Sequence, residues 1–322
     1  MGMSAVARDK SEQVRELPKA CSDEVAAVEF LEKQRWGQHP YCPRCESRRV
    51  HKLKDRRTGD RSKRFLWYCE ICCRQFTVRI GTVFEDSRIP LRHWCYAFWA
   101  ACASKKGVSA LQIKRQTGLS YKSALFLMHR IRWALQDDPL STAKLEGTIE
   151  ADETYVGGKP RYKGNNKRGM GADKVPVFAL VKRGGEARAF VPRKVTAASI
   201  SRHIHEHVSP PHARLMTDQS WAYTKIGRKF GGGHYSVNHA KKEYSRIDPE
   251  TGAVVSTNTV EGFFSILKRG LYGTYHSVSE KHLHRYISEF EYRYNTRRMN
   301  DGERVTKAIR QAAGKRLRYR EP

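Results

Sequence analysis

The chain has 322 residues, with 61 Lys and Arg against 33 Asp and Glu, and its formal net charge is +28. This charge predicts a polyanionic partner, nucleic acid ahead of an anionic membrane surface, and the length allows two or three compact units. No apolar run approaches the ~20 residues that cross a bilayer, and the polar N-terminus does not fit a signal peptide. The composition therefore excludes a membrane-spanning chain, disfavours a secreted disulfide scaffold and predicts a cytoplasmic protein that contacts nucleic acid.

The N-terminal part contains one predicted helix followed by two pairs of cysteines. Ser22 precedes an acidic first turn, which indicates a helix from about Asp23 to Gln34. The pairs have the form C-x2-C with 23 residues between them, and their members are Cys42, Cys45, Cys69 and Cys72. Four thiolates complete the tetrahedral sphere of a structural zinc ion and leave no position for water. Cys73 leaves a second register open, but Cys72 repeats the spacing of the first pair, so we predict one Zn²⁺ in a zinc ribbon.

The segment after the ribbon is predicted to be helical. Residues 91–102 are strongly apolar, which indicates a buried helix whose two cysteines belong to the core. A short helix over 108–116, a turn containing Gly118 and a basic helix over 121–135 follow, and together they are typical of a helix-turn-helix. Two packed helices without a DNA role share this pattern, so both interpretations stay open.

An acidic strand is predicted over Thr148–Tyr155, in a protein that is otherwise basic. It carries Glu150, Asp152 and Glu153. A strand inside a domain seldom holds carboxylates unless something binds them, because an unpaired buried charge is costly. Alternation places Glu150 and Asp152 on one face and Glu153 on the other. The stretch predicts either a divalent-cation site or a solvated edge strand. Glu150 is either an acid just outside the metal ligands or a surface acid, and we expect the latter.

The elements that follow predict an α/β domain. The pattern indicates strands over 175–181, 187–191, 213–218 and 234–239, and helices over 196–207, 221–230, 258–268 and 280–297. We expect Pro210-Pro211 to separate the first of these helices from the strand after it. With the acidic strand in first place, the order β-β-β-α-β-α-β-α describes a ribonuclease-H-like fold with a mixed five-stranded sheet.

Two further acids are candidates to join Asp152. Asp218 lies 66 residues beyond Asp152 at the end of the predicted fourth strand, and Glu261 lies 43 residues further on in a predicted helix. Each has a competing role: Asp218 could cap the helix that starts near Trp221, and Asn258 to Glu261 fits a capping box.

The sequence around these acids resembles a known family. Three stretches resemble the three motif blocks of zinc-ribbon DDE transposases of bacterial insertion sequences, which are related to the eukaryotic Merlin group: Glu-Ala-Asp-Glu-Thr-Tyr-Val-Gly-Gly-Lys from Glu150, Thr-Asp-Gln-Ser-Trp-Ala-Tyr from Thr217, and Asn-Thr-Val-Glu-Gly-Phe-Phe-Ser-Ile-Leu-Lys-Arg from Asn258. The resemblance spans roughly residues 25–300. It implies that Asp152, Asp218 and Glu261 bind two divalent metals. Some members carry Asn at the third position, whereas this chain has Glu261.

The chemistry of DNA cleavage requires the same set of groups. Phosphodiester hydrolysis needs an activated water and stabilisation of the departing 3′ oxygen, and two Mg²⁺ (or Mn²⁺) ions ~3.5–4 Å apart supply both. Magnesium prefers carboxylate oxygens, so three acids are enough to hold the pair. We expect Asp152 to bridge the ions and Asp218 and Glu261 to hold one each. Water would first free a 3′-OH end, which would then attack target DNA.

These observations predict a DNA transposase in five segments. They are 1–35, with a short helix; 36–80, the zinc ribbon; 81–140, helical and helix-turn-helix-like; 148–300, the RNase-H-like catalytic domain; and 301–322, a basic C-terminal tail whose helix covers 304–313. DNA contacts are expected from Lys122, Arg130, Lys159, Arg161, His239, Lys268 and Arg269, with a structural role for His239 as the alternative.

The expected partner is double-stranded DNA, both the terminal inverted repeats of a transposon and the target. Two ends must be held together, so we expect a homodimer or a higher oligomer, associated with the nucleoid. Two other interpretations stay open. One is a DNA-binding regulator with an inert α/β domain, and the other is a nuclease of similar fold that cuts without joining.

Overall fold

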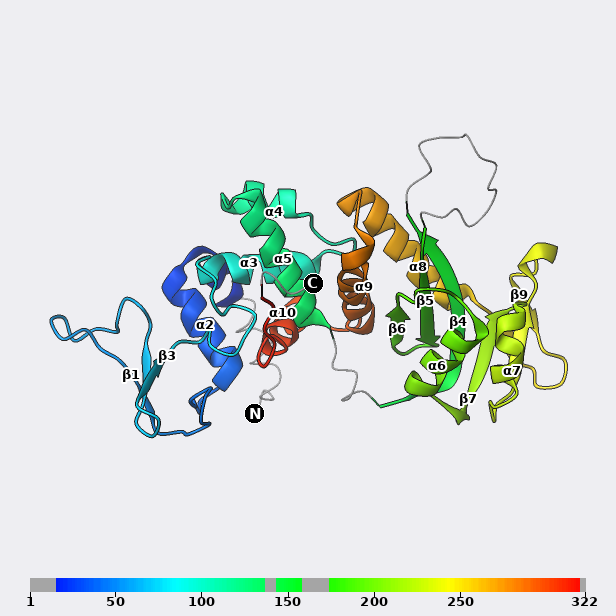
Figure 1. The fold of residues 1–322 in the computed structure, drawn as a ribbon, viewed down its shortest axis with the longest axis horizontal. Coiled ribbons are helices and arrows are strands. Elements are labelled where there is room, and N and C mark those ends of the chain that lie inside the picture. Colours follow the sequence, from blue (N-terminus) through cyan, green and yellow to red (C-terminus); the bar gives the residue numbers. More distant parts are fainter. Residues whose placement is uncertain (1–15, 137–142, 158–173, 319–322) are drawn as a thin grey trace, which may run out of the picture. The chain divides into compact units, whose positions relative to one another are not determined.

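The structure, a computed structural model, describes residues 16–136, 143–157 and 174–318. The chain divides into two compact units, one formed by residues 1–136 with 298–322 and the other by residues 137–297. Figure 1 shows the elements of each unit along the chain. Among the described residues, no helix combines the length and the hydropathy that a bilayer crossing requires.

The first unit begins with a helix that packs on a small sheet. Helix α2 (Glu24–Trp36) starts at Asp23, whose side chain accepts a hydrogen bond from the Ala26 amide at 2.7 Å. The sheet is antiparallel and consists of β1 (Val50–Lys52), β2 (Trp67–Cys69) and β3 (Arg74–Phe76). The ring of Trp36 lies 5.4 Å from that of Trp67 and 5.9 Å from that of Phe76. These aromatic contacts give the ribbon an apolar core of its own.

Three helices follow, with bounds close to the predicted ones. They are α3 (Leu91–Ala103), α4 (Ala110–Thr117) and α5 (Tyr121–Leu135). Gly118 ends α4 in the left-handed conformation, with φ of 72°, and its amide donates to the Lys114 carbonyl. Ser120 then caps α5 by accepting from the Ser123 amide. The glycine is needed here because a side chain is strained at this φ.

The C-terminal segment is an integral part of the first unit. Helix α10 runs over Asp301–Arg310 and buries Val305, Ala308 and Ile309. After it, the Val83 amide donates to the Ala312 carbonyl at 3.3 Å. The segment predicted to be a separate basic tail therefore contributes apolar side chains to a core, which its surplus of cations does not suggest.

The second unit is built on a mixed five-stranded sheet, as predicted. Its strands are β4 (Leu145–Val156), β5 (Val175–Lys182), β6 (Ala187–Phe190), β7 (Val208–Asp218) and β8 (His234–Val237), in the order β6-β5-β4-β7-β8. β4, β5 and β6 form an antiparallel meander, and β7 runs parallel to both β4 and β8. The acidic strand β4 is thus central rather than an edge strand.

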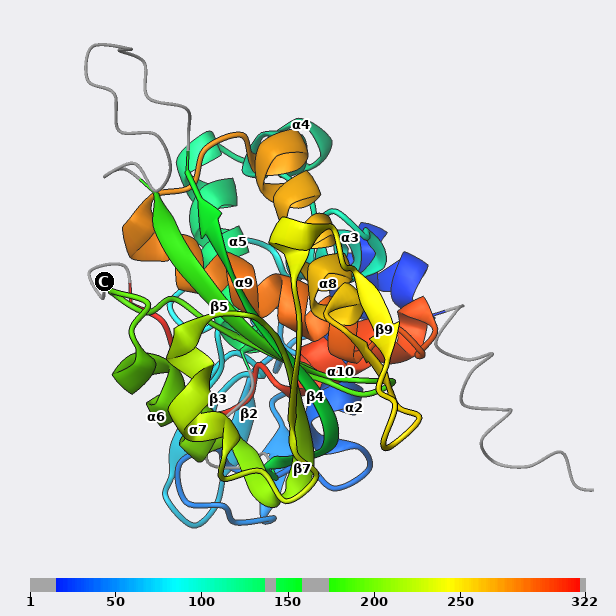
Figure 2. The ribbon, with the colours of Figure 1, turned by 90° about the vertical axis from the view of Figure 1, so that its right-hand side faces the viewer.

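Helices cover both faces of this sheet (Figure 2). On one face, α6 (Ala197–His207), η1 (Trp221–Tyr223) and α7 (Thr224–Gly227) pack against Ile149 and Ala151. On the other face, α8 (Asn258–Gly270) and α9 (Glu280–Asn295) pack against Val177, Ala179 and Val181. The alternation of strand side chains divides the core into these two layers.

Two local predictions were wrong, and one hairpin was missed. β7 begins at Val208 and runs through Pro210-Pro211, because the prolines lie where the pairing with β4 shifts register and fewer ladder amides are needed. The helix predicted to reach Phe230 ends at Gly227. A hairpin formed by β9 (Ser245–Ile247) and β10 (Val254–Ser256) was not anticipated, because its strands have only three residues each.

Candidate active site and zinc centre

The four predicted cysteines converge in the first unit. Their sulfur atoms lie within 4.8 Å of one another, with 3.7 Å between Cys42 and Cys72 and 3.5 Å between Cys45 and Cys69. Zn–S bonds of about 2.3 Å in a tetrahedron separate the sulfurs by about 3.8 Å, so the cluster has the right size for zinc. Cys73 is exposed and its thiol points at the Glu70 carbonyl, which settles the register in favour of Cys72.

The environment of these thiols also suits a cation. Hydrogen bonds from the backbone amides of Cys72 and Ile71 lower the pKa of Cys69 to about 7, despite its burial. Burial raises the pKa of Cys72 to about 12. A metal binds the deprotonated thiol, and backbone amides that donate to a thiolate favour that form.

The sheet of the second unit brings Asp152 and Asp218 side by side. The parallel strands β4 and β7 pair Glu150 with Met216, and the same register continued by two residues places Asp152 level with Asp218. Paired residues of parallel strands point to the same face, and neighbouring strands are about 4.8 Å apart. The two carboxylates thus share a face at the carboxyl end of β7.

Burial perturbs both acids, and negative neighbours add to the effect at Asp152. The pKa of Asp152 is raised to about 7, first by burial and then by the negative charges of Glu153, Asp218 and Glu261. Burial also raises the pKa of Asp218, while the Ser220 amide and His239 lower it. The Oδ1 atom of Asp218 is buried without a hydrogen-bond partner among the described protein atoms. These acids crowd one another, although the three carboxylates do not converge within 4.8 Å as the cysteines do.

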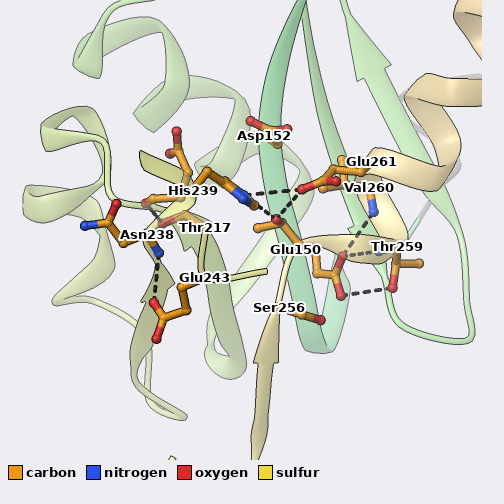
Figure 3. A network of polar contacts seen from close by, with 12 residues as sticks. Glu150, Asp152, Thr217, Asn238, His239, Glu243, Ser256, Thr259, Val260 and Glu261 are labelled. Carbon is orange, nitrogen blue, oxygen red and sulfur yellow. Dashed lines mark hydrogen bonds and ion pairs between the residues drawn. The ribbon is translucent and has the colours of Figure 1, made fainter. Parts of the chain in front are cut away.

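Glu150 is not a surface acid, and that prediction was wrong. Its side chain is fully buried and accepts hydrogen bonds from the amides of Thr259, at 2.7 Å, and Val260, at 3.0 Å (Figure 3). It also accepts from the Thr259 hydroxyl at 2.9 Å and from Arg183 Nε at 2.6 Å. A carboxylate at the N-terminus of α8 satisfies amides that have no partner within the helix.

This arrangement removes the competing role of Glu261. Helix α8 starts after Thr257, so the capping box expected from Asn258 does not form. Glu150 from the neighbouring strand caps the helix instead, and the Glu261 carboxylate is left on the side of Asp152. In the same way, Ser220 rather than Asp218 caps η1, by accepting from the Ala222 amide.

Arg183 links Glu150 to β10, the strand that leads into α8. Its guanidinium donates to the carbonyls of Val254 and Ser256, at 2.6 and 3.0 Å, and to the Ser256 hydroxyl at 2.9 Å. The charge of Glu150 is therefore compensated by a charged hydrogen-bond network. Sequence reasoning missed both residues; the available signal was that Glu150 shares a strand face with Asp152.

His239 lies beside Glu261. Its Nε2 atom is 3.0 Å from the Thr257 hydroxyl and 3.3 Å from Glu261 Oε1, and the Thr257 hydroxyl donates to the same carboxylate oxygen at 2.9 Å. Figure 3 shows His239 between β8 and α8, facing Glu261. The ring of Tyr244 lies 5.7 Å from that of His239. These contacts fix the orientation of the Glu261 carboxylate.

Glu153 occupies the opposite face of β4 and serves a different purpose. The hydroxyl of Tyr223, a fully buried residue, donates to its carboxylate. Burial raises the pKa of Glu153, and this hydrogen bond lowers it. The contact ties η1, which follows Asp218 in the chain, to the strand that carries Asp152.

Comparison with known proteins identifies the family. Residues 22–75 match the transposase zinc-ribbon domain and residues 144–295 match the ISXO2-like transposase domain, together more than half of the chain. The chain belongs to the zinc-ribbon transposases of insertion sequences. An uncharacterized protein in transposable element ISH50 of Halobacterium salinarum is 29% identical over 307 residues, which cover 92% of this chain and 98% of that protein.

Membership of a transposase family implies DNA binding, and the predicted contact residues fall into three groups. Lys122 and Arg269 are exposed, and Lys268 is half-buried. Lys159 and Arg161 lie outside the described residues. Arg130 was predicted wrongly: it is buried and donates to the carbonyls of Val83, Glu85 and Leu317, at 2.7 to 3.1 Å. It holds the first unit together and is not available to a phosphate.

Proposed function

We propose that this protein is an active DDE transposase, which binds transposon-end repeats, cuts them with water to free 3′-OH ends and joins these ends to target DNA on the nucleoid. The observation that carries the proposal is the placement of Asp152 and Asp218 at one level of neighbouring strands, with Glu261 close enough for its charge to raise the pKa of Asp152. Buried carboxylates that repel one another destabilise the fold unless cations bind between them, and such a cluster stands out in a protein of net charge +28.

The three carboxylates fit a pair of Mg²⁺ or Mn²⁺ ions. Oxygen donors suit these cations, and the buried, unpartnered Oδ1 of Asp218 is an atom that a cation would satisfy. Ligands of two ions spread over a wider space than those of one, so convergence within 4.8 Å is not required. When bound, such ions supply Lewis acidity and an activated water. Asp152 would contact both, and Asp218 and Glu261 one each.

The protein's own residues prepare this site. Glu150 holds the first turn of α8 against β4, and His239 with Thr257 orients the Glu261 carboxylate. The strand order, with an antiparallel meander followed by two parallel strands, supports assignment to the ribonuclease-H-like fold. Rigid strands rather than loops carry two of the three acids, which favours precise placement.

The surface around the acids suits DNA. Trp221 follows Asp218 by three residues and is 78% exposed, although its neighbours Ala222 and Tyr223 are buried. Tyr244, beside His239, is 58% exposed. Exposed aromatic rings next to basic side chains such as Lys241 and Lys242 form a platform for bases and phosphates. We propose that the ribbon and the α4–α5 pair, with Lys122, bind the transposon ends. A homodimer or higher oligomer would hold two such ends together.

A strand-transfer assay tests the proposal. The full chain is incubated with Mg²⁺ or Mn²⁺, target DNA and candidate flanking repeats, either intact or pre-cut. We expect wild-type protein to nick the intact end and to join the pre-cut end, and Asp152→Ala to do neither while binding DNA as before. Glu146→Ala is the matched control, since Glu146 is an exposed acid on the same strand.

Three outcomes would contradict the proposal. Binding without any metal-dependent cleavage would make the protein a regulator with an inert α/β domain. Cleavage without joining of a pre-cut end would make it a nuclease. Cleavage that persists in Asp152→Ala would move the chemistry to other residues.

A further inference from the structure

Helix α6, on the face of the sheet opposite α8, carries a second group of possible metal ligands. His203, Glu206 and His207 occupy positions i, i+3 and i+4, so they lie on one side of the helix. One donor atom of each lies within 4.8 Å of the others. The same carboxylate oxygen of Glu206 is 3.9 Å from His203 Nδ1 and 3.9 Å from His207 Nε2. Within the described residues, only the ribbon cysteines form another such group.

The two imidazoles are held in place by a single phenyl ring. Phe190, the last residue of β6, stacks on His203 with 4.4 Å between centroids and 14° between planes. It also stacks on His207, at 4.6 Å and 27°. The rings therefore lie nearly parallel to the same phenyl face. Imidazole binds a metal in the plane of its ring, so stacking on Phe190 does not block the ring nitrogens, and it restricts the motion of both rings.

His203 also lacks hydrogen bonds that its burial requires. Its side chain is 13% exposed, and both ring nitrogens are buried without a hydrogen-bond partner among the described protein atoms. A buried polar group without a partner costs about 1–3 kcal/mol. A ligand that accepts a ring nitrogen lone pair would recover part of this cost.

We propose that His203, Glu206 and His207 form a second zinc site, with three protein ligands and one open coordination position. Two imidazoles and a carboxylate are a donor set that suits Zn²⁺. Tetrahedral bonds of about 2.0–2.2 Å place the donors about 3.4 Å apart. The two distances to Glu206, 3.9 Å each, must therefore shorten by about half an ångström. Glu206 is 53% exposed and can make this adjustment without disturbing the core.

The surrounding charges decide how tightly the ion is held. Burial and the positive charges of Arg202, near His203, and Arg188, near His207, lower the pKa of both histidines. The same cations, with Lys144, repel a divalent ion, and only Glu206 offsets them within the group. The α6 site is thus weaker than the ribbon, where four thiolates surround the metal.

A metal here would brace the last turn of α6, because all three ligands lie on that helix. His207 ends α6, and Val208 begins β7. Arg188 of β6 already donates to the His207 carbonyl at 3.2 Å. The zinc site would therefore add a second restraint to the end of the helix that precedes β7.

Zinc stoichiometry tests the proposal independently of any DNA activity. The full chain is titrated with Zn²⁺ in equilibrium dialysis against excess Mg²⁺, which occupies the carboxylate site. Bound zinc is measured by mass spectrometry, with the ribbon as internal reference. We expect wild-type protein to bind two equivalents, the second more weakly, and Glu206→Gln and His207→Asn to bind one. His205→Asn is the matched control, because His205 is exposed on the same helix outside the group, and it should bind two.

A second measurement separates a lost site from a lost fold. Zinc added beyond the first equivalent should raise the melting temperature of wild-type protein and leave that of Glu206→Gln unchanged. Circular dichroism should be the same for both. A wild-type protein that saturates at one equivalent would overturn the proposal, and so would variants that still bind two.

Discussion

The ribbon and the carboxylate site place cation-binding groups in opposite ways. The ribbon takes its four cysteines from two short knuckles, each closed by local hydrogen bonds, such as that from the Glu46 amide to the Cys42 carbonyl. The carboxylate site draws Asp152 from β4, Asp218 from β7 and Glu261 from α8. The cysteine cluster is therefore assembled locally, whereas the three carboxylates come near one another only because the sheet and α8 fold together.

The largest effect is expected in the ribbon. Structural zinc contributes about 10–16 kcal/mol of binding free energy in zinc-finger peptides. Cys42→Ser should therefore unfold the segment around β1–β3 and abolish binding to transposon ends, with the sheet of the second unit intact. Hydrogen exchange measured by mass spectrometry checks this. Cys73→Ser is the control, and equal loss of protection in both variants would contradict the zinc assignment.

The next largest effect is the pH dependence of stability that Asp152 causes when no divalent metal is present. Its pKa rises from 3.8 to about 7 on folding, so between these values the unfolded chain has lost a proton that the folded chain retains. Stability is therefore lost as the pH rises from about 4 to about 7. The penalty above pH 7 is about 4 kcal/mol.

Asp152→Asn removes this penalty. Urea unfolding with chelator should find the variant more stable than wild type at pH 8, with the difference shrinking toward pH 4. Mg²⁺ should reduce the difference in unfolding free energy between the variant and wild type at pH 8, because it stabilises only wild type. A stability difference independent of pH would show that Asp152 is not perturbed by its neighbours.

A variant of Glu150 tests whether its hydrogen-bond network stabilises the fold and positions Glu261. Glu150→Gln removes the charge that compensates Arg183 and weakens the cap of α8, which we expect to cost about 3 kcal/mol of unfolding free energy. Cleavage should fall as well, because Glu261 is no longer fixed. Urea denaturation measures the first effect, with Glu146→Gln as an exposed control on the same strand. Unchanged stability would mean that the network is dispensable.

The smallest effect is expected at His239. Loss of a hydrogen-bond partner of a metal ligand typically weakens metal affinity by 10–100-fold. His239→Asn should therefore raise the Mg²⁺ concentration needed for cleavage by such a factor, with little change at saturating metal. His212→Asn, at an exposed histidine of β7, is the control. A loss of cleavage that saturating Mg²⁺ does not restore would assign His239 a role other than holding Glu261.

Local patterns in the sequence determined much of this protein. Paired C-x2-C knuckles predict a tetrahedral thiolate site because neighbouring residues create the geometry, and Gly118 and Ser120 mark the end of one helix and the start of the next. The alternation and order of the strands were enough for the mixed sheet. Motif resemblance selected Asp152, Asp218 and Glu261, which spacing alone would have left as candidates with competing roles.

Only the tertiary structure decided what each charged group does. Glu150 is a buried helix cap and Arg130 a buried clamp, although both belong to residue types that usually remain in water. The C-terminal segment packs apolar side chains into the core of the first unit. Pro210-Pro211 lie within β7, where its pairing with β4 shifts register. The partners of Glu150 and Arg130 lie on other elements, so packing between distant segments rather than the neighbours in the chain decides that these charges are buried.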